Sequence, residues 1–206
     1  MSKITLLGGT ASPFTRKVRI VLEEKNIPFE QIKAATAGED NPIIPVNPLG
    51  KIPTIVIDGG KSLYDSSVIV EYLDTIVPTP PLLPPPGLDR VEVKRWESLG
   101  DGICDAGVAL MGERRRTVET ERSQEFIDRQ YNKFTRGIAV AAGELGDREW
   151  CHGNAFSLAD IALVTALDYI EFRFPEMGWR KRYPNLAAYQ ARVAKRPAFA
   201  STQPSD

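Results

Sequence analysis

The chain has 206 residues, which is enough for one large domain or two small ones with a sizeable core. Hydrophobic residues make up 42% of it and charged residues 26%, which is typical of a soluble globular protein. With 26 basic and 27 acidic residues the formal net charge is −1, so we expect neither nucleic acid nor an anionic membrane as a partner.

Several features of the sequence indicate a reducing compartment, with the cytosol as the default location. No segment approaches the apolar length that spans a bilayer, and the first residues lack the long apolar stretch and cleavage site of a signal peptide. The two cysteines, Cys104 and Cys151, are too few for a disulfide scaffold. Because His152 is the single histidine, a multi-histidine site is excluded and no metal is expected.

Strand-like and helix-like patterns alternate over the first part of the chain. The predicted elements, in chain order, are a buried strand over 4–7, a helix over 14–22, strands over 29–32, 54–57 and 61–64, and a helix from 68 to 73. Residues 26–28 end the first helix, residues 58–60 form a hairpin turn, and a polar, proline-bearing stretch occupies 34–50. This order, βαβ followed by ββα, predicts an N-terminal α/β domain.

A proline-rich segment separates this part from a helical remainder. Six prolines lie between Val77 and Gly87, and because proline continues neither a helix nor a central strand, we predict a stiff, extended linker. Beyond it we find only helical patterns, and one of them, over 158–170, is apolar nearly all round, as in a helix buried by its neighbours. The predicted divisions are therefore a first domain over 1–77, a linker over 78–88 and an all-helical domain over 89–206.

Two polar segments of the first domain contain candidate site residues that also have a purely structural explanation. Ser12 precedes Pro13 where the first strand gives way to the first helix, and this pair suits an N-cap and a first helical residue. In the segment 47–54, Gly50 marks a tight turn and Pro53 opens a strand, which suits a turn that leads into an edge strand. An X–Pro bond in a folded protein is cis only about 5% of the time, so this segment alone does not predict cis geometry.

A third segment, formed by Tyr64, Asp65 and Ser66, opens the next predicted helix. Asp65 and Ser66 can satisfy the free N–H groups of that helix as a cap. A helix N-terminus with exposed amides also binds a carboxylate well, and an adjacent acidic side chain can hold an ammonium group. The segment therefore fits either a helix cap or a binding site for a zwitterion.

Together, in this order and spacing, the three segments and the helical second half resemble the glutathione S-transferase family over essentially the whole chain. The resemblance implies an N-terminal thioredoxin-like domain, a C-terminal helical-bundle domain and a homodimer. It also implies glutathione as co-substrate and a small electrophile as the second substrate. A serine-type, bacterial-like form is indicated, because no tyrosine precedes Tyr64 and no cysteine precedes Cys104.

The resemblance also implies a role for residues of each segment. Ser12 would hydrogen-bond the glutathione sulfur, and Ile52, followed by a cis Pro53, would offer its main-chain N–H and C=O to the cysteinyl part. Asp65, in place of the commoner glutamate, and Ser66 would hold the ammonium and carboxylate of the γ-glutamyl end. The full glutathione-binding set implied is Ser12, Phe14, Lys51, Ile52, Pro53, Asp65 and Ser66.

Other residues are assigned structural or open roles. Lys51 either reaches the glycine carboxylate of glutathione or is a solvated turn lysine. Ser157 and Asp160 look like the family's capping motif, as a capping-box variant, so Asp160 is expected to be structural. Cys104 is interpreted as a buried small residue on the helix that lines the second-substrate pocket in this family. Arg114–Arg116 are interpreted as a solvated helix face, with binding of an anionic co-substrate as the alternative.

The resemblance leaves three kinds of function open. The leading interpretation is a detoxifying transferase that joins glutathione to an electrophile. The same site could instead serve peroxide reduction or reductive dehalogenation. A third interpretation is a glutathione-binding stress or interaction protein without turnover, against which Ser12 argues. The sequence does not identify the electrophile.

Overall fold

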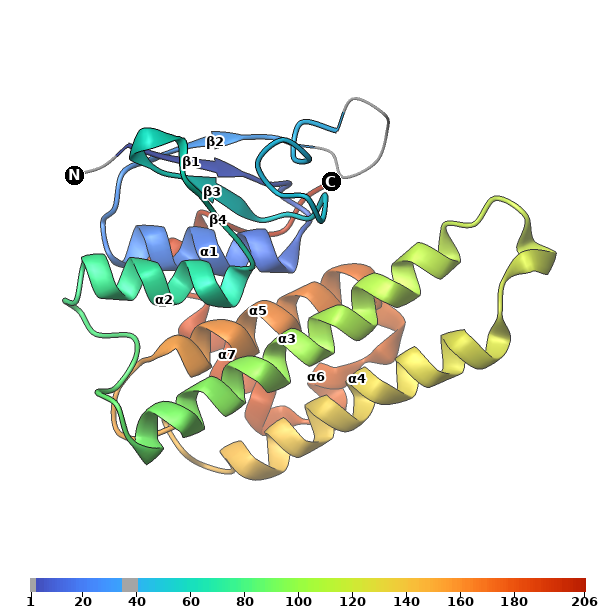
Figure 1. Ribbon diagram of the computed structural model, residues 1–206. Helices are drawn as coiled ribbons and strands as arrows, with labels where there is room; N and C mark the ends of the chain where they lie inside the picture. The colour runs from blue at the N-terminus through green and yellow to red at the C-terminus, as the bar shows by residue number, and fades with distance from the viewer. Residues whose placement is uncertain (1–2, 35–40) are drawn as a thin grey trace. The chain divides into compact units, whose positions relative to one another are not determined.

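The computed structural model describes residues 3–34 and 41–206, so residues 35–40 of the predicted polar stretch lie outside the described part. The chain forms two compact units, which we call unit 1 (Met1–Leu83 with Arg196–Asp206) and unit 2 (Pro84–Lys195). Their elements can be followed in Figure 1. Within the described ranges, no helix combines the length and the apolar character that a membrane crossing requires.

Unit 1 is built on a four-stranded mixed sheet. Its elements are β1 (Ile4–Leu7), α1 (Pro13–Glu24), β2 (Phe29–Ile32), β3 (Thr54–Val56), β4 (Ser62–Leu63), α2 (Ser66–Ile76) and α8 (Pro197–Ala200). The strand order is β2-β1-β3-β4, with β1 parallel to β2 and β3 antiparallel to both of its neighbours. Figure 1 shows α1 and α2 side by side on one face of the sheet. The predicted βαβ-ββα domain is confirmed.

Apolar residues at strand and helix spacing form the core of unit 1. Leu6 of β1 and Ile55 of β3 are paired in register and fully buried. Val18 and Leu22, four residues apart on α1, are also fully buried. Burying each of these side chains stabilises the fold by about 1.5–3 kcal/mol. The patterns used to predict the elements are therefore also the ones that build this core.

The start of the predicted linker is held to unit 1. The ammonium group of the fully buried Lys25 side chain donates to the carbonyls of Val77 (2.6 Å) and Pro80 (2.9 Å) and lies 2.7 Å from Asp74 Oδ1. Asp74 in turn accepts the amide of Leu82 at 2.9 Å. Removing one partner of such a buried ion pair costs about 3–5 kcal/mol. Residues 78–83, the first part of the predicted linker, therefore belong to unit 1.

The C-terminal segment Arg196–Asp206 belongs to unit 1. The predicted division places it in the helical domain. Arg196 forms a bidentate ion pair with Glu24 at the end of α1, with N···O distances of 2.8 and 2.7 Å. Phe199 of α8 is fully buried. Helical periodicity shows that a terminal helix has an apolar face, but not on which unit that face packs.

Unit 2 is helical, as predicted. Its helices are α3 (Leu88–Arg114), α4 (Gln124–Leu145), α5 (Leu158–Arg173), α6 (Trp179–Arg182) and α7 (Pro184–Val193). The long helix α3 packs against both α4 and α5. Every residue of α5 from 158 to 170 is buried, which confirms the prediction of a helix covered by its neighbours.

A buried polar cluster fixes the start of α5. Ser157 and Asp160 form the predicted capping box, in which the Ser157 N–H donates to Asp160 Oδ2 at 2.7 Å. The other carboxylate oxygen of Asp160 accepts from the Cys151 N–H at 2.9 Å and from the Tyr189 hydroxyl at 2.6 Å. Burial, together with the charge of Asp160, raises the pKa of the Cys151 thiol well above its ordinary value. Asp160 is structural, and Cys151 is held as an unreactive thiol.

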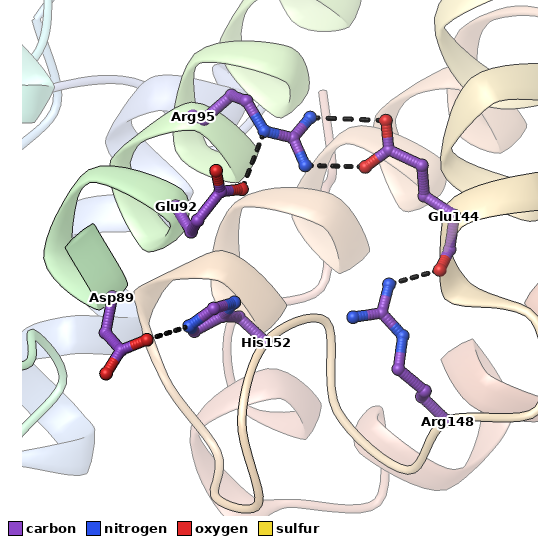
Figure 2. A network of polar contacts seen from close by, with 6 residues as sticks. All are labelled: Asp89, Glu92, Arg95, Glu144, Arg148 and His152. Atoms are coloured by element: carbon purple, nitrogen blue, oxygen red, sulfur yellow. Dashed lines mark hydrogen bonds and ion pairs between the residues drawn. The ribbon is translucent and has the colours of Figure 1, made fainter.

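Polar and charged side chains link α3, α4 and the loop before α5, as Figure 2 shows. Arg95 pairs with Glu92 on its own helix (2.9 Å) and with Glu144 on α4 (2.6 Å). His152 lies 3.1 Å from Asp89 at the start of α3. Ion pairs on a protein surface contribute roughly 0–1 kcal/mol each, so apolar packing is what mainly holds these helices together.

The contact between α3 and α5 depends on a glycine. A Cβ atom placed on Gly100 would lie 2.8 Å from the carbonyl carbon and oxygen of Ala162 on α5. These are main-chain atoms in the buried part of α5, which cannot move aside as a side-chain end would. For Gly102, two residues further along α3, the corresponding position has no neighbour within 4 Å among the described residues, apart from the adjoining backbone of its own helix.

We therefore expect opposite effects from the same substitution at two positions of α3. Gly100→Ala should lower the free energy of unfolding by about 1–3 kcal/mol, because it overpacks the helix contact. Gly102→Ala should raise it by up to about 1 kcal/mol, because alanine favours the helix and meets no neighbour. Urea unfolding of both variants measures the difference, and equal stability of the two would contradict the close approach of α3 and α5.

Candidate functional site

Strand pairing brings three polar segments of unit 1 to one edge of its sheet. Leu7, the last residue of β1, pairs with Thr54, the first residue of β3. Leu63, the last residue of β4, pairs with Ile55. Because β3 is antiparallel to both neighbours, the end of β1, the start of β3 and the end of β4 lie at the same edge.

The three segments found in the sequence adjoin these strand ends. Ser12 follows β1, Ile52 and Pro53 precede β3, and Asp65 follows β4. Two of the segments are in contact range, since a Cβ atom placed on Gly9 would lie 3.7 Å from Ile52 Cδ1. The structure therefore groups, within one unit, segments that are up to about fifty residues apart in sequence.

Ser12 caps α1, as its local sequence predicts. Its hydroxyl oxygen accepts a hydrogen bond from the Thr15 N–H at 3.2 Å, and Pro13 occupies the first helical position. The Ser12 N–H donates to the Gly9 carbonyl at 3.2 Å. The cap uses only a lone pair of the hydroxyl oxygen, so the O–H proton can be donated to another acceptor. That oxygen lies at the positive end of the α1 dipole.

The turn before β3 is organised by an asparagine to which the sequence analysis gave no role. Asn47 is 1% exposed, and its amide group donates to the Lys51 carbonyl at 2.9 Å and to Thr54 Oγ1 at 3.1 Å. The Ile52–Pro53 bond that follows is cis, as the resemblance implies. An asparagine three residues before a turn glycine is a sequence signal that could have identified this residue.

Asp65 caps α2, and its carboxylate is charged at neutral pH. Oδ1 accepts the N–H of Ser67 at 3.0 Å, the hydroxyl of Ser67 and the N–H of Val68 at 3.5 Å. Burial by itself raises the pKa of the Asp65 carboxyl. The hydrogen bonds from Ser67 and Val68 and the charge of Lys17 outweigh burial, so the pKa lies below its ordinary value. Ser66, the first residue of α2, is buried at 4% exposure.

The other predicted site residues lie on the same segments. Phe14 is half-buried on the first turn of α1, and Lys51 is exposed on the turn before Ile52. Lys17 of α1, which is 1% exposed, is a further residue of this site, because its positive charge helps to lower the pKa of Asp65. Lysine is seldom buried, and nothing in its local sequence marked it.

The sequence left the roles of Cys104 and of Arg114–Arg116 undecided. Cys104 is buried on α3, as interpreted. Arg114 pairs with Glu176 at 2.9 Å and Arg116 with Glu113 at 3.1 Å, and both arginines are exposed. The exposure agrees with the interpretation of solvated side chains, but α3 ends at Arg114, so Arg115 and Arg116 lie beyond the helix and not on its face.

Comparison with known proteins identifies the family. The model of the glutathione S-transferase N-terminal domain matches residues 6–81, and that of the glutathione S-transferase C-terminal domain matches residues 124–192. The uncharacterized GST-like protein YibF of Escherichia coli (strain K12) is 36% identical over 199 residues, which cover 97% of this chain and 98% of YibF. The chain belongs to the glutathione S-transferase family.

Solved structures agree with this assignment. A glutathione S-transferase from Methylobacterium radiotolerans, in complex with glutathione sulfonate, has a TM-score of 0.94 and 42% identity, covering 99% of this chain and 96% of that one. A glutathione S-transferase from Methylobacillus flagellatus, with glutathione bound, also has a TM-score of 0.94 and 42% identity, covering 98% of this chain and 100% of that one.

Proposed function

We propose that this protein is a glutathione transferase that holds glutathione at the sheet edge formed by the three segments and activates its thiol through Ser12. The observation that carries the proposal is the geometry of Ser12. Its oxygen accepts from the Thr15 N–H, so the same hydroxyl can cap α1 and donate to a sulfur atom. The structural and the chemical interpretation of this serine are therefore compatible.

The energetics of such a site are sufficient. A free thiol has a pKa near ~8.5, so only a few per cent is thiolate at neutral pH. Lowering that pKa by ~2 units requires about 2.7 kcal/mol of preferential thiolate stabilisation. A hydroxyl hydrogen bond to a charged acceptor contributes roughly 1.5–3 kcal/mol, and the N-terminus of α1 about 0.3–1 kcal/mol.

In the proposed reaction Ser12 remains a neutral donor. The glutathione thiol loses its proton to solvent, and the Ser12 hydroxyl stabilises the sulfur anion that remains. The sulfur forms a bond to a carbon atom of the electrophile, and the leaving group departs with the electron pair of its broken bond. Because glutathione supplies the nucleophile, the protein needs no reactive cysteine of its own.

The γ-glutamyl end of glutathione carries an ammonium and a carboxylate, which suit the start of α2. All three hydrogen bonds received by Asp65 from Ser67 and Val68 end on Oδ1, so Oδ2 can accept from the ammonium group. Ser66 offers its hydroxyl and the N-terminal amide of α2 to the carboxylate. Charge and helix end together would fix this part of the ligand.

The middle and the glycine end of glutathione would lie along the turn before β3. The main chain of Ile52 would pair with the cysteinyl unit as an added strand, with Pro53 beside it. Phe14 would pack against the ligand near Ser12, and Lys51 would face the glycine carboxylate. The Methylobacterium and Methylobacillus relatives, solved with glutathione sulfonate and with glutathione, support binding of this ligand.

The proposal also covers the second substrate, the biological role and the location of the enzyme. The second substrate is a small electrophile, and detoxification of such compounds is the role that fits this chemistry. A cytoplasmic location fits a chain with two cysteines, both of them buried. Peroxide reduction and reductive dehalogenation would use the same thiolate, so a panel of electrophiles, peroxides and halogenated compounds identifies the reaction.

The first prediction of this proposal separates the chemical role of Ser12 from its role as a cap. Ser12→Ala should lower the conjugation rate near neutral pH by roughly 10- to 150-fold, because about 1.5–3 kcal/mol of thiolate stabilisation is lost. Ultraviolet titration of bound glutathione should show a raised thiol pKa, and the rate should recover partly at higher pH.

A matched control is available in unit 2. Ser123 caps α4 with the same geometry, accepting from the Phe126 N–H at 3.2 Å. Ser123→Ala should cost the same cap energy of about 0.5–2 kcal/mol and leave the thiol pKa unchanged. Equal thiol pKa values in wild type and Ser12→Ala would make Ser12 a cap and nothing more.

A second prediction concerns Asp65. Asp65→Asn retains an oxygen that can cap α2 but removes the charge, so glutathione affinity should fall about ten-fold, or 1.4 kcal/mol, with little loss of stability. Asp65→Ala should lose both affinity and about 0.5–2 kcal/mol of stability. Calorimetry that finds wild-type affinity in Asp65→Asn would remove the ammonium contact from the account.

A third prediction concerns assembly, since family membership suggests a homodimer. Light scattering at micromolar concentration should report twice the chain mass of 22.8 kDa. A monomer mass under those conditions would refute the proposed dimer.

A further inference from the structure

The C-terminal segment Arg196–Asp206, which we call the strap, runs along α1 within unit 1. At its start, Arg196 pairs with Glu24 near the end of α1 at 2.7 and 2.8 Å. Further along, the Phe199 carbonyl accepts from Arg16 at 3.4 Å, nearer the start of α1. Two residues on, the strap bonds nearer the end of the helix, since the Ser201 carbonyl accepts from Arg19 at 3.4 Å and the Ser201 hydroxyl donates to Glu23. The strap is therefore held against α1 at several points.

The far end of the strap contacts the loop that carries Ser12. The Thr10 hydroxyl donates to the Ser205 carbonyl at 2.9 Å. Before that point the strap is packed into unit 1, since Phe199 and Thr202 are fully buried, and the Thr202 hydroxyl donates within the strap to the Ala198 carbonyl at 2.7 Å. Thr10 is thus bonded to a segment that is itself anchored.

This contact lies in the middle of a short loop whose two ends are already fixed. At one end the Gly8 N–H donates to the Ile32 carbonyl at 3.1 Å, and the Gly8 carbonyl accepts from the Gln31 side chain at 3.1 Å. At the other end Ser12 caps α1. Between them, the bond from Thr10 restrains the part of the loop that precedes Ser12 directly.

We propose that Thr10 is a positioning residue for Ser12, and that the strap, through the Ser205 carbonyl, holds the serine loop in the geometry in which the Ser12 hydroxyl meets the glutathione sulfur. This inference rests on the proposed function of Ser12. The bond is exposed, so it adds little to global stability. Its effect is local, and a displacement of about 1 Å at a reacting group can lower a rate up to a hundred-fold.

The test compares two threonines that make the same kind of bond. Thr10→Val removes the hydroxyl with little change in shape. Thr75→Val is the control, because Thr75 is exposed on α2 and its hydroxyl donates to the Glu71 carbonyl at 2.8 Å, away from the strand ends. Both variants are made in the full chain, with Thr10→Ser as the conservative variant that keeps the hydroxyl.

Thr10→Val should lower kcat for conjugation about ten-fold, raise the pKa of the bound glutathione thiol, and leave KM for glutathione within about two-fold. Thr10→Ser should restore kcat, and Thr75→Val should behave as wild type. A Thr10→Val enzyme with wild-type kcat and thiol pKa, or one changed only in KM, would overturn the proposal.

A double-variant cycle tests whether the strap is the partner. Ending the chain after Gln203 removes the Ser205 carbonyl and should reproduce the Thr10→Val phenotype. Adding Thr10→Val to that shortened chain should then have no further effect, because the contact that Thr10 makes with Ser205 is already absent. Fully additive effects of the two changes would show that Thr10 does not act through the strap.

One readout is independent of any activity. In ligand-free protein, amide hydrogen exchange of Ala11 and Ser12 should be faster in Thr10→Val than in Thr75→Val. Unchanged exchange would overturn the positioning role even if glutathione binds. Faster exchange in a protein whose wild type neither binds nor ionises glutathione would instead support the strap and refute the proposed function.

Discussion

The antiparallel pairing of β3 with both β1 and β4 is the constraint on which the candidate site depends. It turns the end of β1, the start of β3 and the end of β4 toward one edge of the sheet, and so brings together Ser12, Ile52 and Asp65. A slip of one residue in either pairing would turn every side chain of β3 to the other face and expose the buried Ile55. The hydrophobic core therefore fixes the register, and the register places the polar segments.

The same residues that assemble the site also end or begin regular structure. Ser12 and Asp65 both cap helices, and each still has hydrogen-bonding capacity beyond the cap: the O–H proton of Ser12 and the second carboxylate oxygen of Asp65. A helix start presents unpaired N–H groups whatever its function, so a ligand-binding edge built from helix starts needs few additional polar residues. This explains why the local sequence fits a cap and a binding site equally well.

Much of the fold could be predicted from the sequence because the signals are local. The alternation over the first seventy residues, the apolar run of α5 and the Ser157–Asp160 capping box each lie within a few residues, and the structure confirms them. The grouping of the candidate site could not be predicted from local patterns, since strand register is a long-range property. It was expected only because the order of the segments resembled a known family.

The features missed by the sequence analysis are tertiary. Lys25 looks like an ordinary basic residue after a helix, yet its partners Val77 and Pro80 lie more than fifty residues away. In the sequence the strap looks like the end of a helical domain, yet Arg196 pairs with Glu24, which is 172 residues away. The sequence shows that Lys25 and Arg196 are charged and that the terminal helix has an apolar face. Only the folded chain shows which residues pair with those charges and which unit that helix packs on.

The most direct test of the account is the structure of this protein with glutathione bound. We expect the ligand at the shared strand edge, with its γ-glutamyl end at Asp65 and Ser66 and its cysteinyl main chain paired with Ile52. The sulfur should then lie within hydrogen-bonding distance of Ser12 Oγ, while Ser12 still accepts from the Thr15 N–H. A ligand bound elsewhere, or bound with its sulfur directed away from Ser12, would contradict the central claim.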